Sequence, residues 1–207
     1  HVRSRRQRQM CIRDRDEQAQ DTETSEGHTF GYSCIDIYNP YYDVVKESIR
    51  GELEAKGDTL VVKNPDGDVN KQIQQIQEMI DEGVDAVFLA PVDWEAIKPA
   101  LEALDEADIP VINVDTQVKD TDMTAAYIGS DNKNAGAVCG ENLKTQCLDG
   151  GKVVLLECPF QNSVNERITG FEEAIKNAGF EVVARADAGG TKAVSYTHLR
   201  AHETTLH

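Results

Sequence analysis

The sequence is poor in aromatic residues and lacks long hydrophobic runs, paired cysteines and a glycine-rich loop, and these absences exclude several classes of protein. No apolar run reaches the 18 or more residues that mark a membrane-spanning helix. None of the five cysteines forms a Cys-x-x-Cys pair, so no paired metal spacing is present. No glycine-rich phosphate loop follows the first predicted strand, which argues against dinucleotide-binding and P-loop enzymes.

Positive charge is also scarce. The chain has 21 Lys and Arg against 37 Asp and Glu, which gives a formal net charge of −16. A protein of this sign repels the phosphate backbone, so nucleic acid is not an expected partner.

The two ends of the sequence are related at the level of their coding. The segment Met10–Asp14 can be coded as ATG TGT ATA AGA GAC, and the reverse complement of this string encodes Val194–His198. The pattern resembles translated transposon-type sequencing adapters, and Leu199–Thr204 continues it. We therefore expect residues 1–15 and 193–207 to be non-native. The alternative for the arginine-rich first segment is a basic nucleic-acid-binding arm.

Leaving out these two segments sharpens the composition. They hold seven of the arginines, one Asp and one Glu, so residues 16–192 keep 14 basic and 35 acidic residues and a formal net charge of −21. His28 is the one histidine left, so no histidine-based triad or metal site is available. The remaining cysteines are expected to be buried small residues or free thiols: Cys34, Cys139, Cys147 and Cys158.

The pattern of apolar residues indicates an α/β fold. Residues 16–28 are acidic without apolar periodicity, and we expect a disordered linker there. From Phe30 onward, short β-rich runs alternate with stretches of helical period, which predicts parallel β-α-β units. The first predicted series has strands at 30–34, 59–62, 86–89 and 111–114 and helices at 41–55, 69–82 and 94–107.

These elements predict two lobes. The first, over residues 29–128, is a doubly wound, Rossmann-like parallel sheet. The second begins at 129–192, with helices predicted at 132–147 and 164–178 and strands at 152–156 and 182–186. Two strands are too few to close such a sheet, so we expect an incomplete lobe cut off by the end of the sequenced fragment.

The start of the first predicted helix offers a candidate binding site. Pro40 fits the first helical position and Asn39 is a good N-cap. They place Tyr41 and Tyr42 at the carboxyl end of the first strand, where open α/β sheets bind ligands. Two aromatic faces beside a side-chain amide suit a small polyhydroxylated ligand. The alternative is a capped helix whose tyrosines only pack.

Two aspartates follow predicted strands. Asp115 comes directly after the strand at 111–114, so its carboxylate is expected at the same edge and can accept two hydroxyl hydrogen bonds. Its alternative role is that of a loop or cap residue. Asp93 is interpreted as the N-cap of a helix that begins at Trp94, and Trp94 as a packing residue rather than a ligand platform.

Arg167 lies in the first turns of the predicted helix at 164–178. A guanidinium there can point into a cleft between lobes, or pair on the surface with Glu166 or Glu172. Nothing in the sequence places two carboxylates at a reacting bond, so neither an enzyme nor a cofactor is expected.

Six short motifs occur in order along the chain and together resemble one family. They are similar to the ribose-type family of periplasmic sugar-binding proteins, the solute receptors of bacterial ABC importers, and the similarity covers about residues 29–192. The motifs are Asn39-Pro40-Tyr41-Tyr42, Gly83-Val84-Asp85-Ala86, Ala90-Pro91-Val92-Asp93, Ile109-Pro110-Val111 through Val114-Asp115, Gly129-Ser130-Asp131-Asn132, and Asn165-Glu166-Arg167 with Gly170-Phe171.

The resemblance implies two Rossmann-like lobes that clamp a sugar, and it implies roles for matching residues. Asn39 would hydrogen-bond sugar hydroxyls, and Tyr41 and Tyr42 would stack on the ring. Asp115 would bind hydroxyls from the first lobe, and Arg167 would reach the ring oxygen and hydroxyls from the second. The segment Gly129-Ser130 would lie near the crossover between lobes, with Asp131 capping the next helix.

The resemblance also implies a setting. The protein would be a monomeric receptor in the periplasm or outside the cell, with a possible lipid anchor. It would bind a neutral monosaccharide or polyol and deliver it to the membrane subunits of an ABC importer.

Two departures from the family pattern leave the sugar open. Ribose-binding members usually have Arg where this chain has Thr116, and many have an aromatic residue near Ala188-Gly189-Gly190. The alternative functions are the ligand-sensing core of a lactose-repressor-type regulator, whose helix-turn-helix would precede the first strand, and an enzyme or sensor ectodomain.

Overall fold

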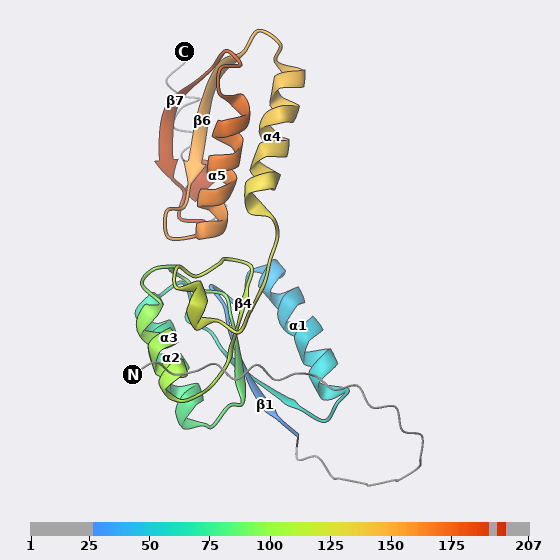
Figure 1. Cartoon of the computed structure of the whole chain (residues 1–207), viewed down its shortest axis with the longest axis vertical. Coiled ribbons are helices and arrows are strands. Elements are labelled where there is room, and N and C mark those ends of the chain that lie inside the picture. The colour runs from blue at the N-terminus through green and yellow to red at the C-terminus, as the bar shows by residue number, and fades with distance from the viewer. Residues whose placement is uncertain (1–26, 191–193, 198–207) are drawn as a thin grey trace, which may run out of the picture.

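The computed structural model describes residues 27–190 and 194–197, which form two lobes. The lobes lie one above the other in Figure 1 and are joined by the segment between β5 (Ala126–Ile128) and α4 (Asn132–Gln146). Within the described ranges, no helix has both the length and the apolar character needed to cross a membrane.

The first lobe is built on a five-stranded sheet. Its strands lie in the order β2-β1-β3-β4-β5, and each neighbouring pair is parallel. The predicted doubly wound parallel sheet is therefore confirmed for this lobe. Its other strands are β1 (Thr29–Ser33), β2 (Thr59–Lys63), β3 (Ala86–Leu89) and β4 (Val111–Val114), and the short 3₁₀ helix η1 (Thr121–Met123) lies between β4 and β5.

Helices cover both faces of this sheet (Figure 1). The helices α2 (Val69–Asp81) and α3 (Lys98–Glu106) pack against β3 and β4 in one apolar core, which contains Ile76 and Leu101. The helix α1 (Pro40–Glu54) packs against β1 and β2 in the other core. Burial on both faces explains why these strands are nearly continuous apolar runs in the sequence.

The third helix begins four residues later than predicted. We expected a helix over 94–107, but residues 94–97 form a turn and α3 begins at Lys98. Pro99 lacks the N–H that a helix from Trp94 would need to donate to the Glu95 carbonyl, so it is accommodated only in the first turn. Asp93 is therefore not the N-cap of α3, a position that Ile97 occupies. Its Oδ1 instead accepts from the Glu95 and Ala96 amides at 2.9 Å and holds the turn before the helix.

The second lobe follows the predicted order of helix, strand, helix and strand. After α4 come β6 (Gly151–Glu157), α5 (Asn162–Ile175) and β7 (Phe180–Asp187), and β6 pairs with β7 in parallel. The helix α5 ends at Ile175 rather than at the predicted Ala178, because Asn177 adopts a φ of 62° and Gly179 one of 80°. The two helices α4 and α5 pack closely beside each other.

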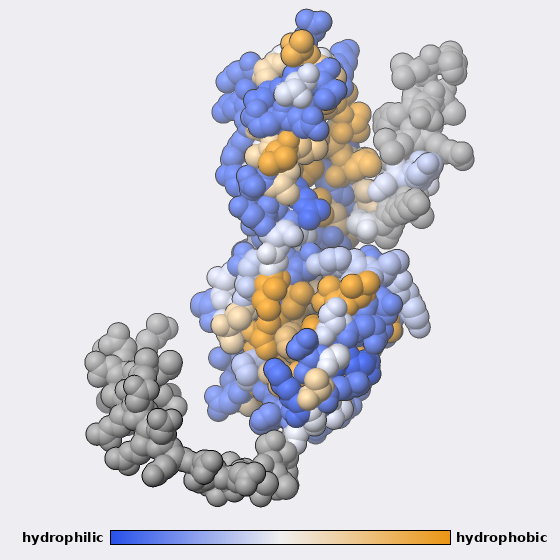
Figure 2. Space-filling view, turned by 90° about the vertical axis from the view of Figure 1, so that its right-hand side faces the viewer, coloured by the Kyte–Doolittle hydropathy of each residue, from blue (hydrophilic) through white to orange (hydrophobic). Residues whose placement is uncertain are grey.

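On the face of the molecule that Figure 2 shows, both lobes carry hydrophilic surface (blue) around smaller apolar areas (orange). This agrees with the large excess of acidic residues in the sequence. The predicted linker at 16–28 lies outside the described residues except for its last two. Of the predicted adapter segments, only 194–197 is described, as a single helical turn.

Candidate functional site

The carboxyl edge of the first sheet holds Asp115 in an uncommon backbone conformation. Its φ is 65°, the left-handed region that costs a residue with a side chain about 1 kcal/mol. Hydrogen bonds fix the backbone on both sides. The Asp115 amide donates to the Ile128 carbonyl at 2.9 Å, and its carbonyl accepts from the Tyr127 hydroxyl at 2.7 Å. Strain that neighbours maintain in this way is typical of functional positions.

Both predicted tyrosines meet this carboxylate. The Tyr42 hydroxyl donates to Asp115 Oδ2 at 2.8 Å, and the Tyr41 hydroxyl donates to Oδ1 at 3.5 Å. Burial, and then the negative charge of Asp115, raise the pKa of both phenols. The phenols therefore stay protonated and remain donors. The Tyr41 side chain is half exposed, whereas Tyr42 is buried and lines the neighbouring cavity.

A cavity of about 380 Å³ lies beside this cluster, between the lobes. Asn39 and Tyr42 line it, whereas Tyr41, Asp115 and Arg167 lie outside its wall. The Asn39 Oδ1 caps α1 by accepting from the Tyr41 amide at 3.0 Å, as predicted, so its Nδ2 hydrogens are left for another partner. The first lobe also contributes Ile35, Asp36, Asp66, Gly67 and Val92, and the second contributes Phe160, Gln161, Gly189 and Gly190.

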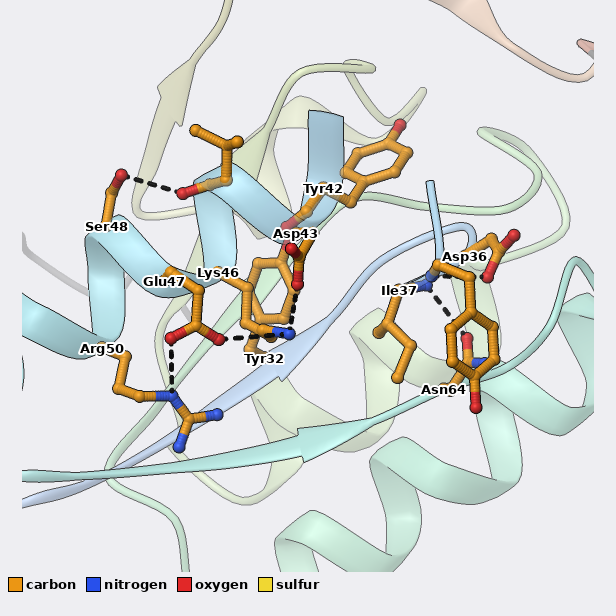
Figure 3. A network of polar contacts seen from close by, with 12 residues as sticks. Tyr32, Asp36, Ile37, Tyr42, Asp43, Lys46, Glu47, Ser48, Arg50 and Asn64 are labelled. Atoms are coloured by element: carbon orange, nitrogen blue, oxygen red, sulfur yellow. Dashed lines mark hydrogen bonds and ion pairs between the residues drawn. The ribbon is translucent and has the colours of Figure 1, made fainter. Parts of the chain in front are cut away.

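Hydrogen bonds between loops hold the cavity wall of the first lobe. The Ile37 amide donates to Asn64 Oδ1 at 3.2 Å, which ties the loop after β1 to the loop after β2 (Figure 3). Figure 3 also shows the ion pairs that Lys46 and Arg50 form with acidic neighbours along α1. These charges neutralise one another on the helix.

Two buried amides that the sequence reasoning missed fix the strand ends. Gln72 accepts from the Val92 amide at 2.8 Å and donates to the Ala90 carbonyl at 3.1 Å. Asn113 donates to the Thr116 carbonyl at 2.9 Å and so holds the turn that carries Asp115. Neither residue carries a sequence signal, because a buried amide inside an apolar pattern looks like an interruption of that pattern.

Arg167 projects from α5 of the second lobe. Its Nε donates to Asn132 Oδ1 at 2.8 Å, and its positive charge lowers the pKa of Tyr41 against the burial, the Asp115 charge and the Asp115 hydrogen bond that raise it. The guanidinium is therefore close enough to act on the tyrosine cluster of the first lobe. The alternative pairing with Glu172 is not seen, because that carboxylate binds Arg185.

The lobes also touch through a direct pair of hydroxyls. The Thr116 Oγ1 and Ser163 Oγ lie 2.8 Å apart, and both residues are buried. A backbone bond from the Trp94 amide to the Phe160 carbonyl adds a second link at 3.1 Å. The sequence reasoning missed this pair, although it singled out the residue at position 116.

The cysteines separate into two environments. Cys34 and Cys158 are buried, whereas Cys139 and Cys147 are exposed, and all four are free thiols. Burial raises the pKa of Cys34 to about 11 and that of Cys158 to about 12. Among the described residues, no three His, Cys, Asp or Glu side chains group in a way that could hold a metal ion.

Iodoacetamide at pH 8 is expected to alkylate Cys139 and Cys147 in the native protein but to leave Cys34 and Cys158 unmodified. The thiolate is the reactive form, and a thiol of pKa about 11 is only about 0.1% ionised at this pH. Peptide mapping by mass spectrometry gives the readout, and the same reaction in 6 M guanidinium is the control in which all four react. Early labelling of Cys34 in the folded protein would contradict this assignment.

Comparison with known proteins connects this geometry to a family. The sequence matches the family described as periplasmic binding protein domain over residues 30–204. It is 28% identical over 161 residues to the ribose import binding protein RbsB of Bacillus subtilis, which covers 77% of this chain and 52% of that protein. It is 30% identical over 167 residues to the galactofuranose-binding protein YtfQ of Escherichia coli, which covers 78% and 52%.

A solved structure gives the same result for the fold. The crystal structure of a galactofuranose binding protein has a TM-score of 0.80 at 24% identity, with 86% of this chain and 62% of that chain covered. The chain spans about half the length of the curated relatives it matches. The matched region includes both lobes and all five candidate residues, and it takes up most of the sequence. The chain belongs to the periplasmic binding protein domain family.

Proposed function

We propose that the complete protein is an extracytoplasmic receptor that binds a neutral monosaccharide or polyol between its two lobes. The observation that carries the proposal is the Asp115 carboxylate, which two tyrosine hydroxyls orient beside a cavity that both lobes line. Asn39, Tyr41, Tyr42 and Asp115 would contact the ligand from the first lobe. Arg167 would contact it from the second.

Charge supports a neutral ligand. Asp115 lies near the cavity, Asp36 and Asp66 line it, and no Lys or Arg is among its lining residues. A phosphorylated or carboxylated sugar would be repelled there, and Arg167 is the cation whose charge acts on Tyr41. Sugar hydroxyls, in contrast, can donate to carboxylates and accept from the guanidinium and the Asn39 amide.

Delivery to the membrane subunits of an ABC importer, with no chemical change in the sugar, completes the proposal. The named relatives bind ribose and galactofuranose, and this favours the receptor over the ligand-sensing core of a lactose-repressor-type regulator. We also propose a monomer outside the cytoplasm, held at the membrane surface by a lipid anchor. Finding the upstream gene segment tests the anchor, which requires a lipid-accepting cysteine after a signal peptide.

Titration calorimetry on the complete protein is the direct test. The panel is D-ribose, L-arabinose, D-galactose, D-fructose, xylitol and myo-inositol, with ribose 5-phosphate as the anionic control. We expect binding of at least one neutral member and none of the phosphate ester. An absence of binding across the panel would remove the sugar-receptor proposal, and tight binding of the ester would remove the argument from charge.

The hydroxyl pair between the lobes is expected to influence affinity through closure. Thr116→Val removes one partner and leaves the Ser163 hydroxyl buried, at a cost of about 1 kcal/mol to the arrangement in which the two lobes touch, so the sugar should bind about five times more weakly. The matched control is the double variant Thr116→Val/Ser163→Ala, which should lose no more than the single one, because each hydroxyl acts through the other. Additive losses in calorimetry would show that they act separately.

We also propose that residues 1–15 and 193–207 derive from adapters and that native domains cover 29–128 and 129–192. Sequencing the locus from unfragmented DNA is the test. The expected result is that neither terminal segment occurs in frame, and finding both would overturn the proposal.

A further inference from the structure

The arginine of the second lobe has an anchor that is unlike a surface contact. Arg167 itself is exposed, yet its Nε donates to the Oδ1 of a residue that is only 1% exposed, Asn132. A free arginine side chain samples many rotamers, and ordering it on ligand binding has an entropic cost. A bond from Nε to a buried acceptor fixes the plane of the guanidinium before any ligand arrives.

The acceptor is itself held rigidly. Asn132 is the first residue of α4, directly after the N-cap Asp131, whose side chain accepts from the Asn134 amide at 3.0 Å. The backbones of α4 and α5 are in close contact one turn after Asn132, since a Cβ on Gly136 would lie 1.9 Å from the Arg167 carbonyl oxygen. The donor and the acceptor therefore belong to two backbones whose relative position is fixed.

The amide nitrogen of the Asn132 side chain argues against a purely structural role for this residue. Its Nδ2 is buried and has no hydrogen-bond partner among the described residues. Buried polar groups are normally paired, and residues that break this rule concentrate at functional positions. An apolar side chain would avoid the unpaired donor, and what it could not supply is the acceptor for Arg167.

The two Nη atoms of the Arg167 guanidinium remain available to a ligand. Binding through Nε uses one of the five N–H donors, and the donors on the two Nη atoms are left to contact a ligand. The positive charge acts on Tyr41 of the first lobe, so the guanidinium lies within electrostatic range of the tyrosine cluster.

We propose that Asn132 is a positioning residue that presets the Arg167 guanidinium for ligand binding. The inference rests on the proposed function for its purpose, but the positioning itself is independent of any sugar. It adds to the binding site a buried residue that contacts the ligand only through Arg167.

The first experiment needs no ligand. The full chain is labelled with ¹⁵N, and the Arg167 Nε–H resonance is identified by its loss in Arg167→Lys. We expect Asn132→Ala to speed hydrogen exchange of this resonance at least tenfold. Asn132→Asp, which keeps an oxygen acceptor, should restore the protection. The control is Asn134→Ala, an exposed position on the same helix, which should leave exchange unchanged.

The second experiment measures affinity for the sugar that binds most tightly in the panel above. Asn132→Ala should weaken binding about tenfold in the wild-type background and less than twofold in an Arg167→Ala background. Unchanged exchange in Asn132→Ala, or an equal loss of affinity in both backgrounds, would overturn the inference. If Asn132→Ala does not fold, Asn132→Ser, whose side chain is too short for this bond, takes its place. If no panel sugar binds, the proposed function fails, and the exchange measurement still decides whether Asn132 holds Arg167.

Discussion

Asp115→Ala is expected to weaken sugar binding by two orders of magnitude or more. The substitution removes the carboxylate, so the ligand hydroxyls would lose their hydrogen bonds to it. Each of these is worth about 1.5–3 kcal/mol as a charged hydrogen bond in a site that excludes water. The buried Tyr42 hydroxyl would also lose its acceptor. A loss of about 2.7 kcal/mol corresponds to a factor of a hundred, so two such bonds suffice.

The strained backbone at position 115 gives this experiment its control. Asp115→Asn keeps a side chain that tolerates the left-handed region and retains an acceptor oxygen for Tyr42, but it removes the negative charge. We expect this variant to fold with near-wild-type stability and to bind about ten times more weakly than wild type. If Asp115 serves only to hold the tyrosines, the alanine variant will instead lose stability in thermal unfolding and keep its affinity once folded.

Arg167→Ala should produce a loss of the same size from the other lobe. Its charge acts on Tyr41, and none of the described second-lobe residues that line the cavity is Lys or Arg. Calorimetry on both variants with one sugar decides whether the two lobes share the ligand. Tight binding that survives both substitutions would reject these sites even if the protein is a sugar receptor.

The edge of the first sheet could be predicted because local rules determine it. Pro40 and Asn39 specify the start of α1, and that start carries the two tyrosines. A parallel sheet then places Asp115, which follows β4, at the edge where β1 also ends. Tyr41 and Tyr42 are 74 and 73 residues from Asp115, yet the topology of the sheet brings all three to one edge, where the two hydroxyls bond to the carboxylate.

Contacts that depend on how packed elements meet could not be predicted in this way. Asn132 and Arg167 are 35 residues apart, and Thr116 and Ser163 are 47 apart. No periodicity links such pairs, because each depends on the distance between two helices or two lobes. The late start of α3 is different. Pro99 is a signal in the sequence for a helix start near position 98, and the prediction of a helix over 94–107 did not use it.

Packing between α4 and α5 also determines the position of Arg167, and Gly136 allows the two helices to pack this closely. Gly136→Ala is expected to lower the free energy of unfolding by about 2–3 kcal/mol, because the added Cβ would lie 1.9 Å from the Arg167 carbonyl oxygen and the two helices would have to separate. The usual gain of about 1 kcal/mol from replacing a helical glycine with alanine is too small to offset this.

The matched control lies on α1. Gly51 is also within a helix, but a Cβ there would meet nothing within 4 Å, so Gly51→Ala should raise stability by about 0.5–1 kcal/mol. Urea unfolding of the two variants measures the difference in sign, and equal stability changes would contradict the close approach of the helices. Because the separation would move the Arg167 backbone, folded Gly136→Ala should also bind the sugar more weakly, whereas Gly51→Ala should bind it normally. A stability loss at Gly136 with unchanged affinity would mean that the guanidinium reaches the ligand whatever the spacing of the helices.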